Sequence, residues 1–433
     1  MNLKNLLSLF SDNGCQKIYV KNLSPNDNSK NQVYLGGSFE ILNILPLSSI
    51  KTEAAGDWKR ERFKASINFC WIGNDGNLFP APKSQLILYP KYPEVRFSGF
   101  LVGCDNPPSE LMTQRLADRL LFLSVAKNGT VLGYVSSPAS TVAREFSKTD
   151  IATGMGVFKV IELPAAANNR QKLLAELRRI HLLNWIISKR FDGKGSLLGC
   201  NHPNCGGYTL EAELGITPNG YSEPDYLGWE IKQFGVKKFE LMNSSVITLM
   251  TPEPNNGFYV KNGVEAFIRK YGYDDVGGIV DRKNFGGVHK VGKEHPRTNL
   301  TMKLIGFDSE SGKIRNSDGR IALLDHRDNE AASWSFASLL LHWNRKHNLA
   351  CYVPSLSEKI PVRKYKYGGK VILGSGTEFP LFLNEMFKGN IYYDPGIKLE
   401  DASTNPKHKA RSQFRIKSVN LQNLYKASEI VTL

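Results

Sequence analysis

The chain has 433 residues, of which 41% are hydrophobic and 22% are charged, proportions typical of a globular protein with two or three domains. Lysine and arginine number 56 against 41 aspartates and glutamates, and the formal charge of +15 favours a polyanionic partner. No run of apolar residues is long enough for a transmembrane helix, and no amphipathic helix lies beside the basic segments to bind a membrane surface. A generically basic soluble protein is the alternative.

The first part of the chain is predicted to be all-β. Residues 1–14 indicate a short surface helix, too short for the apolar core of a secretory signal. In the segment that follows, short apolar stretches such as KIYV and GTVLGYV are separated by Asn, Asp, Gly and Pro turns, as in a barrel. A proline in ELPAAANN then interrupts any continuous helix. We expect a domain at 1–162, a linker at 163–169 and a second domain at 170–433.

The segment YVKNLSPNDNSKNQVYL at 19–35 resembles the start of the N-terminal effector domain of the EcoRII type, a B3-like pseudobarrel that binds DNA. The resemblance implies that two arms of the domain enter the major groove. Asn31 stands where that domain has a histidine, so base contacts there do not transfer. Plain polar turns of a barrel are the alternative. The implied DNA contacts are Lys21, Asn26, Asn31 and Gln32 in the first arm and Lys91, Glu94 and Arg96, from PKYPEVRF, in the second.

The second part of the chain mixes helical and strand patterns, which predicts an α/β domain. Leu173, Leu177, Ile180 and Ile187 repeat at helical spacing within 170–190. WEIKQFGV and SSVITLM are predicted to be neighbouring strands. AASWSFASLLLHWNRKH is predicted to be a buried helix that leads into the strand LACYVP.

The six cysteines are widely spread, which favours reduced thiols in a bacterial cytoplasm. Only Cys200, His202 and Cys205, in CNHPNC, lie close together in the sequence. A zinc site needs four ligands at known spacings, and no matching second half follows. Metal binding by this group is therefore the weaker interpretation.

The segment EPDYLGWEIKQF concentrates acidic residues and a lysine around a predicted strand. Glu230 and Lys232 are two residues apart, so they share one face of the strand. Pro224 and Gly228 allow the chain to bend and bring Asp225 beside Glu230. Two carboxylates suit Mg²⁺, which activates a bound water and neutralises charge on a phosphate, and Lys232 is placed to orient that water. The pattern indicates Mg²⁺-dependent phosphodiester hydrolysis, and a surface ion pair is the alternative.

The longer segment GYTLEAELGITPNGYSEPDYLGWEIK resembles the catalytic segment of the MvaI/BcnI restriction endonucleases and their relative MutH. In that family a helical glutamate precedes a PD-(D/E)xK motif. Glu211 matches the glutamate, and Asp225, Glu230 and Lys232 match the motif. The resemblance implies an α/β PD-(D/E)xK restriction-endonuclease-like fold, with Asp225 and Glu230 as metal ligands and Glu211 supporting the metal or its waters.

Two basic segments in the second part of the chain favour contacts with DNA. GNIYYDPGIKLEDASTNPKHKARSQFRI resembles the C-terminal recognition segment of the family, and Asp394 stands where the family has a base-reading aspartate. Gly396 replaces an arginine of the family, so base recognition there must differ. The second segment is DRKNFGGVHKVGKEHPR, for which a solvated loop is the alternative. The predicted DNA contacts are Asp394, Lys398, Lys407, His408, Arg411, Gln413 and Arg415 in the first segment and Arg282 and Lys283 in the second.

The two resemblances together imply a monomeric Type IIE restriction endonuclease specific for CCWGG. Its partners would be two copies of the site in double-stranded DNA, one for each domain, and a cognate DNA methyltransferase in the same system, with no obligate protein partner. Two alternatives stay open. One is a MutH-like repair nicking endonuclease, and the other is a non-catalytic DNA-binding regulator built on a B3-like domain.

Overall fold

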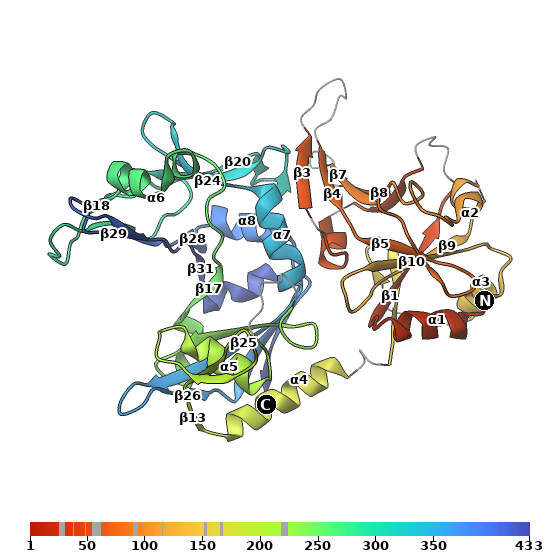
Figure 1. Cartoon of the computed structure of the whole chain (residues 1–433), viewed down its shortest axis with the longest axis horizontal. Helices are drawn as coiled ribbons and strands as arrows, with labels where there is room; N and C mark the ends of the chain where they lie inside the picture. The colour runs from red at the N-terminus through yellow and green to blue at the C-terminus, as the bar shows by residue number, and fades with distance from the viewer. Residues whose placement is uncertain are drawn as a thin grey trace. The chain divides into compact units, whose positions relative to one another are not determined.

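The computed structural model describes residues 1–25, 31–37, 39–47, 49–53, 62–89, 94–114, 116–150, 154–164, 168–217 and 224–433. The chain divides into two compact units, Met1–Lys172 and Leu173–Leu433 (Figure 1). The division falls inside helix α4 (Asn169–Leu182), and residues 165–167 of the predicted linker lie outside the described residues. No described helix is both long and apolar enough to span a membrane.

The first unit is β-rich, as predicted, and contains two sheets. Their strands pair antiparallel except for β10 and β5, which run parallel. The seven-stranded sheet has the order β11 (Gly154–Met155), β12 (Phe158–Glu162), β1 (Lys17–Leu23), β9 (Arg119–Val125), β10 (Val131–Ser136), β5 (Phe69–Ile72) and β6 (Leu78–Pro80). The five-stranded sheet has the order β2 (Val33–Gly36), β8 (Glu94–Ser98), β7 (Gln85–Tyr89), β4 (Arg62–Ser66) and β3 (Ser49–Glu53).

Aromatic side chains join the two sheets of the first unit. Phe69 of β5 packs edge-on against Phe97 of β8, with ring centroids 4.9 Å apart, and Trp71 donates a hydrogen bond from Nε1 to the carbonyl of Phe100. Short helices flank the sheets: α1 (Leu3–Asp12), the 3₁₀ helix η1 (Phe39–Asn43), α2 (Ser109–Thr113) and α3 (Thr141–Ser147). The predicted N-terminal helix corresponds to α1, which buries Leu6 and Phe10. The assignment of this unit as a B3-like pseudobarrel stays a prediction.

The second unit is built around a mixed sheet. The path β13 (Trp185–Ile187), β26 (Lys364–Tyr367), β25 (Leu349–Glu358), β27 (Lys370–Ser375) and β32 (Ala427–Thr432) is antiparallel, and β16 (Glu230–Gly235) joins β25 in parallel. Helix α4 and helix α5 (Cys205–Glu213) contribute Leu173, Leu177 and Leu210 to a core that also contains Trp229 and Ile231. Helix α7 (Phe336–His347) leads directly into β25, as predicted for that helix and strand.

Smaller sheets and helices complete the second unit. The sheets are β14 (Lys189–Phe191) with β15 (Leu197–Gly199); β17 (Val246–Met250), β31 (Phe414–Lys417) and β28 (Ile391–Tyr393); β18 (Tyr273–Asp274), β19 (Lys283–Gly286), β29 (Gly396–Glu400) and β30 (Lys407–Lys409); β20 (Thr301–Ile305), β23 (Arg320–Leu324) and β24 (Glu330–Ser335); and β21 (Phe307–Asp308) with β22 (Lys313–Ile314). The further helices are α6 (Phe258–Tyr271), α8 (Phe379–Phe387) and the 3₁₀ helices η2 (Phe239–Ser244) and η3 (Ser418–Leu424).

Three local predictions for the second unit were wrong. The helix predicted over 170–190 ends at Leu182, because Asn184 has a positive φ of 62° and the β-branched residues that follow form β13. The helix predicted from AASWSF begins only at Phe336, because the preceding residues pair with β23 as β24. β16 and β17 are strands but not neighbours, since β16 pairs with β25 and β17 pairs with β31.

Candidate active site

A tight turn places Asp225 beside the first residues of β16. Tyr226 and Trp229 exchange two backbone hydrogen bonds, of 3.0 and 2.8 Å. The two residues between them, Leu227 and Gly228, both have positive φ, 51° and 84°, as a two-residue type I′ turn requires. The reversal lets the Asp225 Oδ2 atom accept a hydrogen bond of 3.0 Å from the backbone N–H of Ile231. The predicted bend is therefore present, and Asp225 stays partly exposed.

Glu230 and Lys232 share one face of β16, as their spacing predicts. The Lys232 Nζ atom lies 3.0 Å from Glu230 Oε1. Trp229 and Ile231 point to the other side of the strand and pack into the core. Glu230 is only 2% exposed, whereas the Lys232 side chain keeps 19% of its surface exposed. A plain surface ion pair is therefore excluded, because the carboxylate lies inside the protein and the lysine lies at its surface.

A second lysine, which the sequence did not indicate, reaches the same carboxylate. Lys346 of α7 places its Nζ atom 3.5 Å from Glu230 Oε1. The register of β16 explains this contact, because Glu230 pairs with Ala350, four residues after Lys346 in the chain. The only local signal was the basic end of the helix HWNRKH, since 116 residues separate the two partners in the sequence.

Burial dominates the electrostatics of the candidate site. The pKa of Glu230 is raised to about 7, chiefly by burial and also by the charge of Asp225, although Lys232 and Lys346 act in the opposite direction. Burial, and next the charge of Asp225, also raise the pKa of Glu211 on α5. The charges of the three carboxylates and the two lysines therefore influence one another's pKa values. The fold thus brings together all four residues that were predicted for catalysis.

One buried carboxylate oxygen of this cluster lacks a hydrogen-bond donor within the part of the chain that the structure describes and would be stabilised by a cation. Glu230 Oε2 is buried and has no hydrogen-bond donor among the described residues, an arrangement that costs free energy. No three His, Cys, Asp or Glu side chains of the described part of the chain form a ready-made cage for a metal ion. Mg²⁺ needs no such cage, because it binds through one or two carboxylates and keeps several waters. Asp225 and Glu230 therefore fit this ion.

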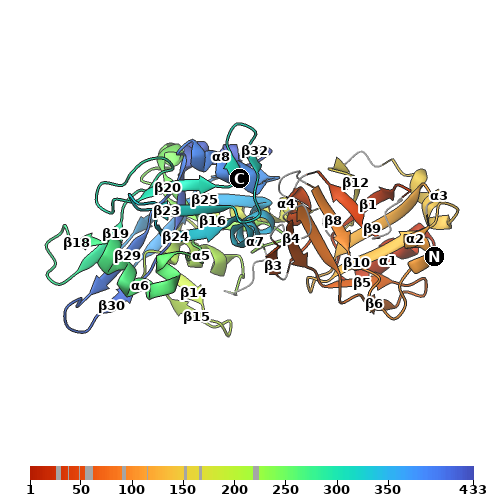
Figure 2. The ribbon, with the colours of Figure 1, turned by 90° about the horizontal axis from the view of Figure 1, so that it is seen from above.

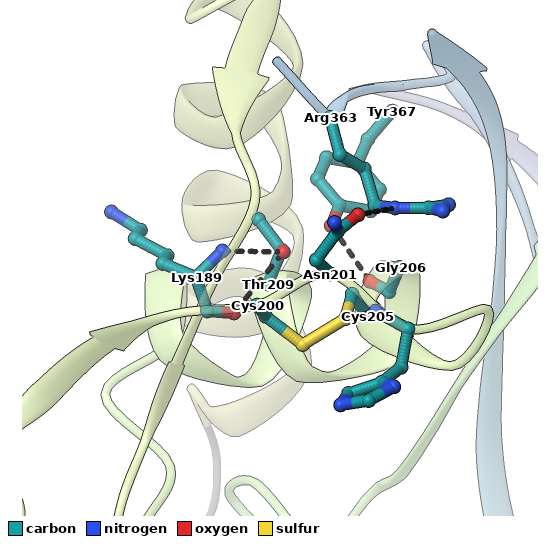
Figure 3. The surroundings of a disulfide bond; sticks show 9 residues. Lys189, Cys200, Asn201, Cys205, Gly206, Thr209, Arg363 and Tyr367 are labelled. Atoms are coloured by element: carbon teal, nitrogen blue, oxygen red, sulfur yellow. Dashed lines mark hydrogen bonds between the residues drawn. A yellow bond between two sulfur atoms is a disulfide. The ribbon is translucent and has the colours of Figure 1, made fainter. Parts of the chain in front are cut away.

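Helix α5, which carries Glu211, is fixed at its start by a disulfide bond. Cys200 and Cys205 are joined, with Cα atoms 5.8 Å apart (Figure 3). Tyr367 donates a hydrogen bond of 2.7 Å to the carbonyl of Gly206 in the first turn of the helix. The expectation of six reduced thiols is thus wrong for this pair, because the short loop between the two residues returns to the helix start and brings the sulfur atoms together. The bond also excludes zinc binding by these sulfur atoms.

The predicted recognition residues of the second unit gather on and beside the sheet β18-β19-β29-β30. Lys398 and Lys409 pair across β29 and β30, as do Glu400 and Lys407, so these side chains share one face. His408 is exposed, but it pairs with buried Leu399 and therefore belongs to the opposite face. Lys398 forms an ion pair with Glu400.

Several of the other residues that were predicted to contact DNA form ion pairs within the protein. The Arg415 Nη1 atom lies 2.6 Å from Asp394 Oδ2, so two residues predicted separately as base readers form one ion pair. Lys283 pairs with Asp274 at 2.7 Å, and Arg282 lies 3.6 Å from Asp275. Arg411 is exposed, whereas Gln413 is only 5% exposed and offers little surface to a base.

The predicted arm residues of the first unit also lie close together where they are described. Arg96 donates a hydrogen bond of 3.3 Å to Gln32 and pairs with Glu94 at 3.0 Å, which joins the two predicted arms. Lys21 and Asn31 line a cavity of about 190 Å³ together with Gln32. Asn26 and Lys91 lie outside the described residues.

A buried histidine of the second basic segment gives a prediction for pH. Burial, and then the charge of His295, lower the pKa of His289 to about 3. An unfolded histidine titrates near 6.5, so the unfolded state binds more protons between these values. We therefore expect thermal stability to fall as the pH drops from 7.5 to 5. The loss should be smaller in His289→Phe, whose ring can stack on Phe285 as the imidazole does. If the difference in Tm between the wild type and His289→Phe were the same at every pH, buried His289 would not be the cause of the pH dependence.

The second unit is similar to known restriction endonucleases. Residues 174–425 match the model of the "MvaI/BcnI restriction endonuclease family". Among solved structures, a complex of restriction endonuclease MvaI with cognate DNA is 19% identical and aligns over 60% of this chain and 97% of that chain, with a TM-score of 0.45. MvaI without DNA is also 19% identical, over 61% of this chain and 98% of that chain, with a TM-score of 0.34. None of the curated proteins matches the chain.

Proposed function

Because this chain belongs to the MvaI/BcnI restriction endonuclease family, we propose that it hydrolyses phosphodiester bonds of duplex DNA at a short specific site, with Mg²⁺ as its cofactor. The single observation that carries the proposal is the cluster of Glu211, Asp225, Glu230 and Lys232, in which a buried carboxylate oxygen has no described hydrogen-bond donor. A cation at this position would satisfy the buried oxygen and keep Glu230 ionised near neutral pH.

Each residue of the cluster would have a separate role in the hydrolysis of the phosphodiester bond. Asp225 and Glu230 would hold Mg²⁺, which when bound lowers the pKa of a water molecule and neutralises negative charge on the phosphate. Lys232 keeps part of its surface exposed, so its ammonium can orient the attacking water and stabilise negative charge on the phosphorus centre. Lys346 contacts the same Oε1 atom of Glu230 as Lys232 does and helps to keep the carboxylate ionised. Glu211 would support the waters around the metal.

Digestion of a plasmid of known sequence tests this function. We expect cleavage only with a divalent cation, linear product after prolonged digestion, and ends that map to one short sequence. Open circles alone would indicate a repair nicking enzyme, and binding without any cleavage would indicate a non-catalytic regulator. Either result would contradict the proposal.

The finer proposal is a monomeric Type IIE enzyme of the bacterial cytoplasm that recognises CCWGG. It rests on the EcoRII-like segment at the start of the first unit and on the MvaI-like second unit, a combination that resembles UbaLAI. The described residues of the second unit supply one catalytic cluster, so one chain would nick one strand, reorient and then cut the other. A cognate DNA methyltransferase would protect the host DNA, and no obligate protein partner is needed.

The effector role predicts that a second copy of the site raises activity. Under single-turnover conditions we expect a two-site plasmid to be cut faster than a one-site plasmid, and a short duplex with the site to stimulate cleavage of the latter. Arg96→Ala should remove the stimulation and leave the basal rate unchanged, because Arg96 joins the two predicted arms of the first unit. Equal rates on both plasmids would contradict the effector role.

A further inference from the structure

The hairpin of β14 and β15 projects from the second unit and has no role in the site described above. Its two strands pair from Lys189 with Gly199 to Phe191 with Leu197. Two large apolar side chains near its end are unusually open to solvent, since Leu197 is 55% exposed and Leu198 is 42% exposed. Arg190, directly opposite Leu198, is exposed as well. Apolar and cationic side chains therefore share the outer part of this hairpin.

The positive charge of the hairpin is largely uncompensated. The segment 189–199 contains three basic residues and one acid, Asp192. The Asp192 Oδ1 atom accepts hydrogen bonds of 2.8 Å from the backbone N–H groups of Lys194 and Ser196 and so shapes the turn. Lys189 is paired with Glu213. Arg190 and Lys194 form no ion pair with a described residue, so both cations face solvent.

The hairpin is held firmly against the helix that carries Glu211. Thr209 accepts a hydrogen bond of 3.1 Å from the Lys189 N–H and donates one of 3.2 Å to the Lys189 carbonyl (Figure 3). The disulfide bond joins the residue after β15 to the first residue of α5. At 100° per residue, Thr209 and Glu213 lie on the face of α5 opposite to Glu211. One helix thus connects the hairpin to the active site.

In the view of Figure 2 the hairpin lies on the same side of the second unit as one strand of the sheet that carries the predicted recognition residues. In Figure 2 the strands β14 and β15 and the strand β30 both reach the lower edge of the second unit. One face of that sheet carries Lys398, Lys407 and Lys409, together with Glu400, which pairs with Lys398. The second unit thus has two projections that carry cationic side chains, as a partner with many negative charges along its length would require.

From these observations we propose that the β14–β15 hairpin is a second DNA-contacting element, which grips the duplex opposite the sheet β18-β19-β29-β30. Arg190 and Lys194 bind backbone phosphates, and Leu197 and Leu198 pack on the apolar sugar and base edges of the adjoining groove. The proposal rests on the proposed function, because its partner is the DNA that the enzyme cuts. The disulfide bond and Thr209 keep the hairpin in place before the duplex arrives, which reduces the ordering cost of binding.

Binding measured across a salt series tests the two kinds of contact separately. Full-length protein is titrated without divalent metal against a duplex that the wild type cuts. Each phosphate contact contributes roughly 0.9 to the slope of log K against log salt, so Arg190→Ala/Lys194→Ala should lower the slope by about 1.8. Leu197→Ala/Leu198→Ala should weaken binding several-fold without changing the slope, because an apolar contact releases no counterions.

Matched control variants show whether the loss of binding is specific to the hairpin or follows from removing any exposed cation or leucine of the second unit. Lys313→Ala/Lys359→Ala removes two exposed cations elsewhere on the unit, and Leu182→Ala/Leu183→Ala removes two exposed leucines; both should bind like the wild type. Thermal melting checks that each variant is folded. A slope and an affinity unchanged in both hairpin variants, with normal cleavage by the wild type, would overturn the hairpin proposal alone. A wild type that neither binds nor cuts DNA would overturn the proposed function with it.

Discussion

Lys232→Ala is expected to reduce DNA cleavage about 10³-fold, the loss typical of removing one preorganised group that stabilises the transition state. DNA affinity measured without metal should stay close to that of the wild type, because one partly exposed lysine is a small part of a basic surface. The measurement is single-turnover cleavage of a labelled duplex at saturating enzyme, together with a binding titration. Lys232 also contacts Glu230 at 3.0 Å, so its loss will make the carboxylate easier to protonate.

Two comparisons isolate the role of this lysine. Raising the Mg²⁺ concentration should restore little activity to Lys232→Ala if the lysine acts on the water and the phosphate, and much activity if it only keeps Glu230 ionised. Lys359→Ala, which removes an exposed lysine elsewhere on the second unit, should cleave like the wild type. Cleavage by Lys232→Ala within a few-fold of the wild-type rate would refute the assignment.

Glu230→Gln is expected to reduce cleavage to a similar degree and to remove the stabilisation that Mg²⁺ gives to the folded protein. An ion that binds only the folded state stabilises it by RT ln(1 + c/Kd), where c is the concentration of the free ion, so Tm rises with the concentration of the ion. The wild type should therefore melt at a higher temperature with Mg²⁺ than with EDTA, because the ion satisfies the buried Oε2 atom. The neutral glutamine side chain binds Mg²⁺ much more weakly than a carboxylate does, so the Tm of the Glu230→Gln variant should respond much less to the metal.

Glu240→Gln is the matched control for this experiment, since Glu240 is exposed at the start of η2. This variant should keep both the cleavage rate and the response of Tm to Mg²⁺. A full Mg²⁺-dependent rise in Tm in Glu230→Gln would show that the ion binds elsewhere.

The rise in Tm that Mg²⁺ gives to the wild type can also be compared at pH 6 and pH 8, and it should be smaller at pH 6. Because the folded-state pKa of Glu230 is raised to about 7, protons should compete with the metal more strongly at the lower pH.

Three of the four residues of the cluster could be predicted from the sequence because their positions depend on local chain geometry. A strand repeats every two residues, so Glu230 and Lys232 had to share a face once β16 formed. A glycine with positive φ at Gly228 allowed the turn that returns Asp225 to the strand. Glu211 followed from the family resemblance and lies on a helix, α5, as implied. Spacing and turn chemistry were therefore sufficient for Asp225, Glu230 and Lys232, whereas Glu211 needed the resemblance.

Other features of the site are contacts between distant segments. Lys346 reaches Glu230 only because α7 leads into β25 and β25 pairs in parallel with β16. Asp394 and Arg415 meet only because β28 and β31 are neighbours, and these two residues, predicted to contact DNA, form an ion pair with each other. Gln413 lies in a segment of alternating basic residues, and its burial became evident only from the packing around it.

The sequence by itself determined the chemistry of this protein: the acids and the lysine of the motif, the order of a β-rich part before an α/β part, and a net charge suited to DNA. The tertiary structure decided how that chemistry is tuned. It buried Glu230 and raised its pKa, added Lys346, joined Cys200 to Cys205 and left the β14–β15 hairpin projecting from α5. The physical reason is that local spacing fixes which side chains share an element, whereas desolvation and the contacts between distant elements exist only after the chain has packed.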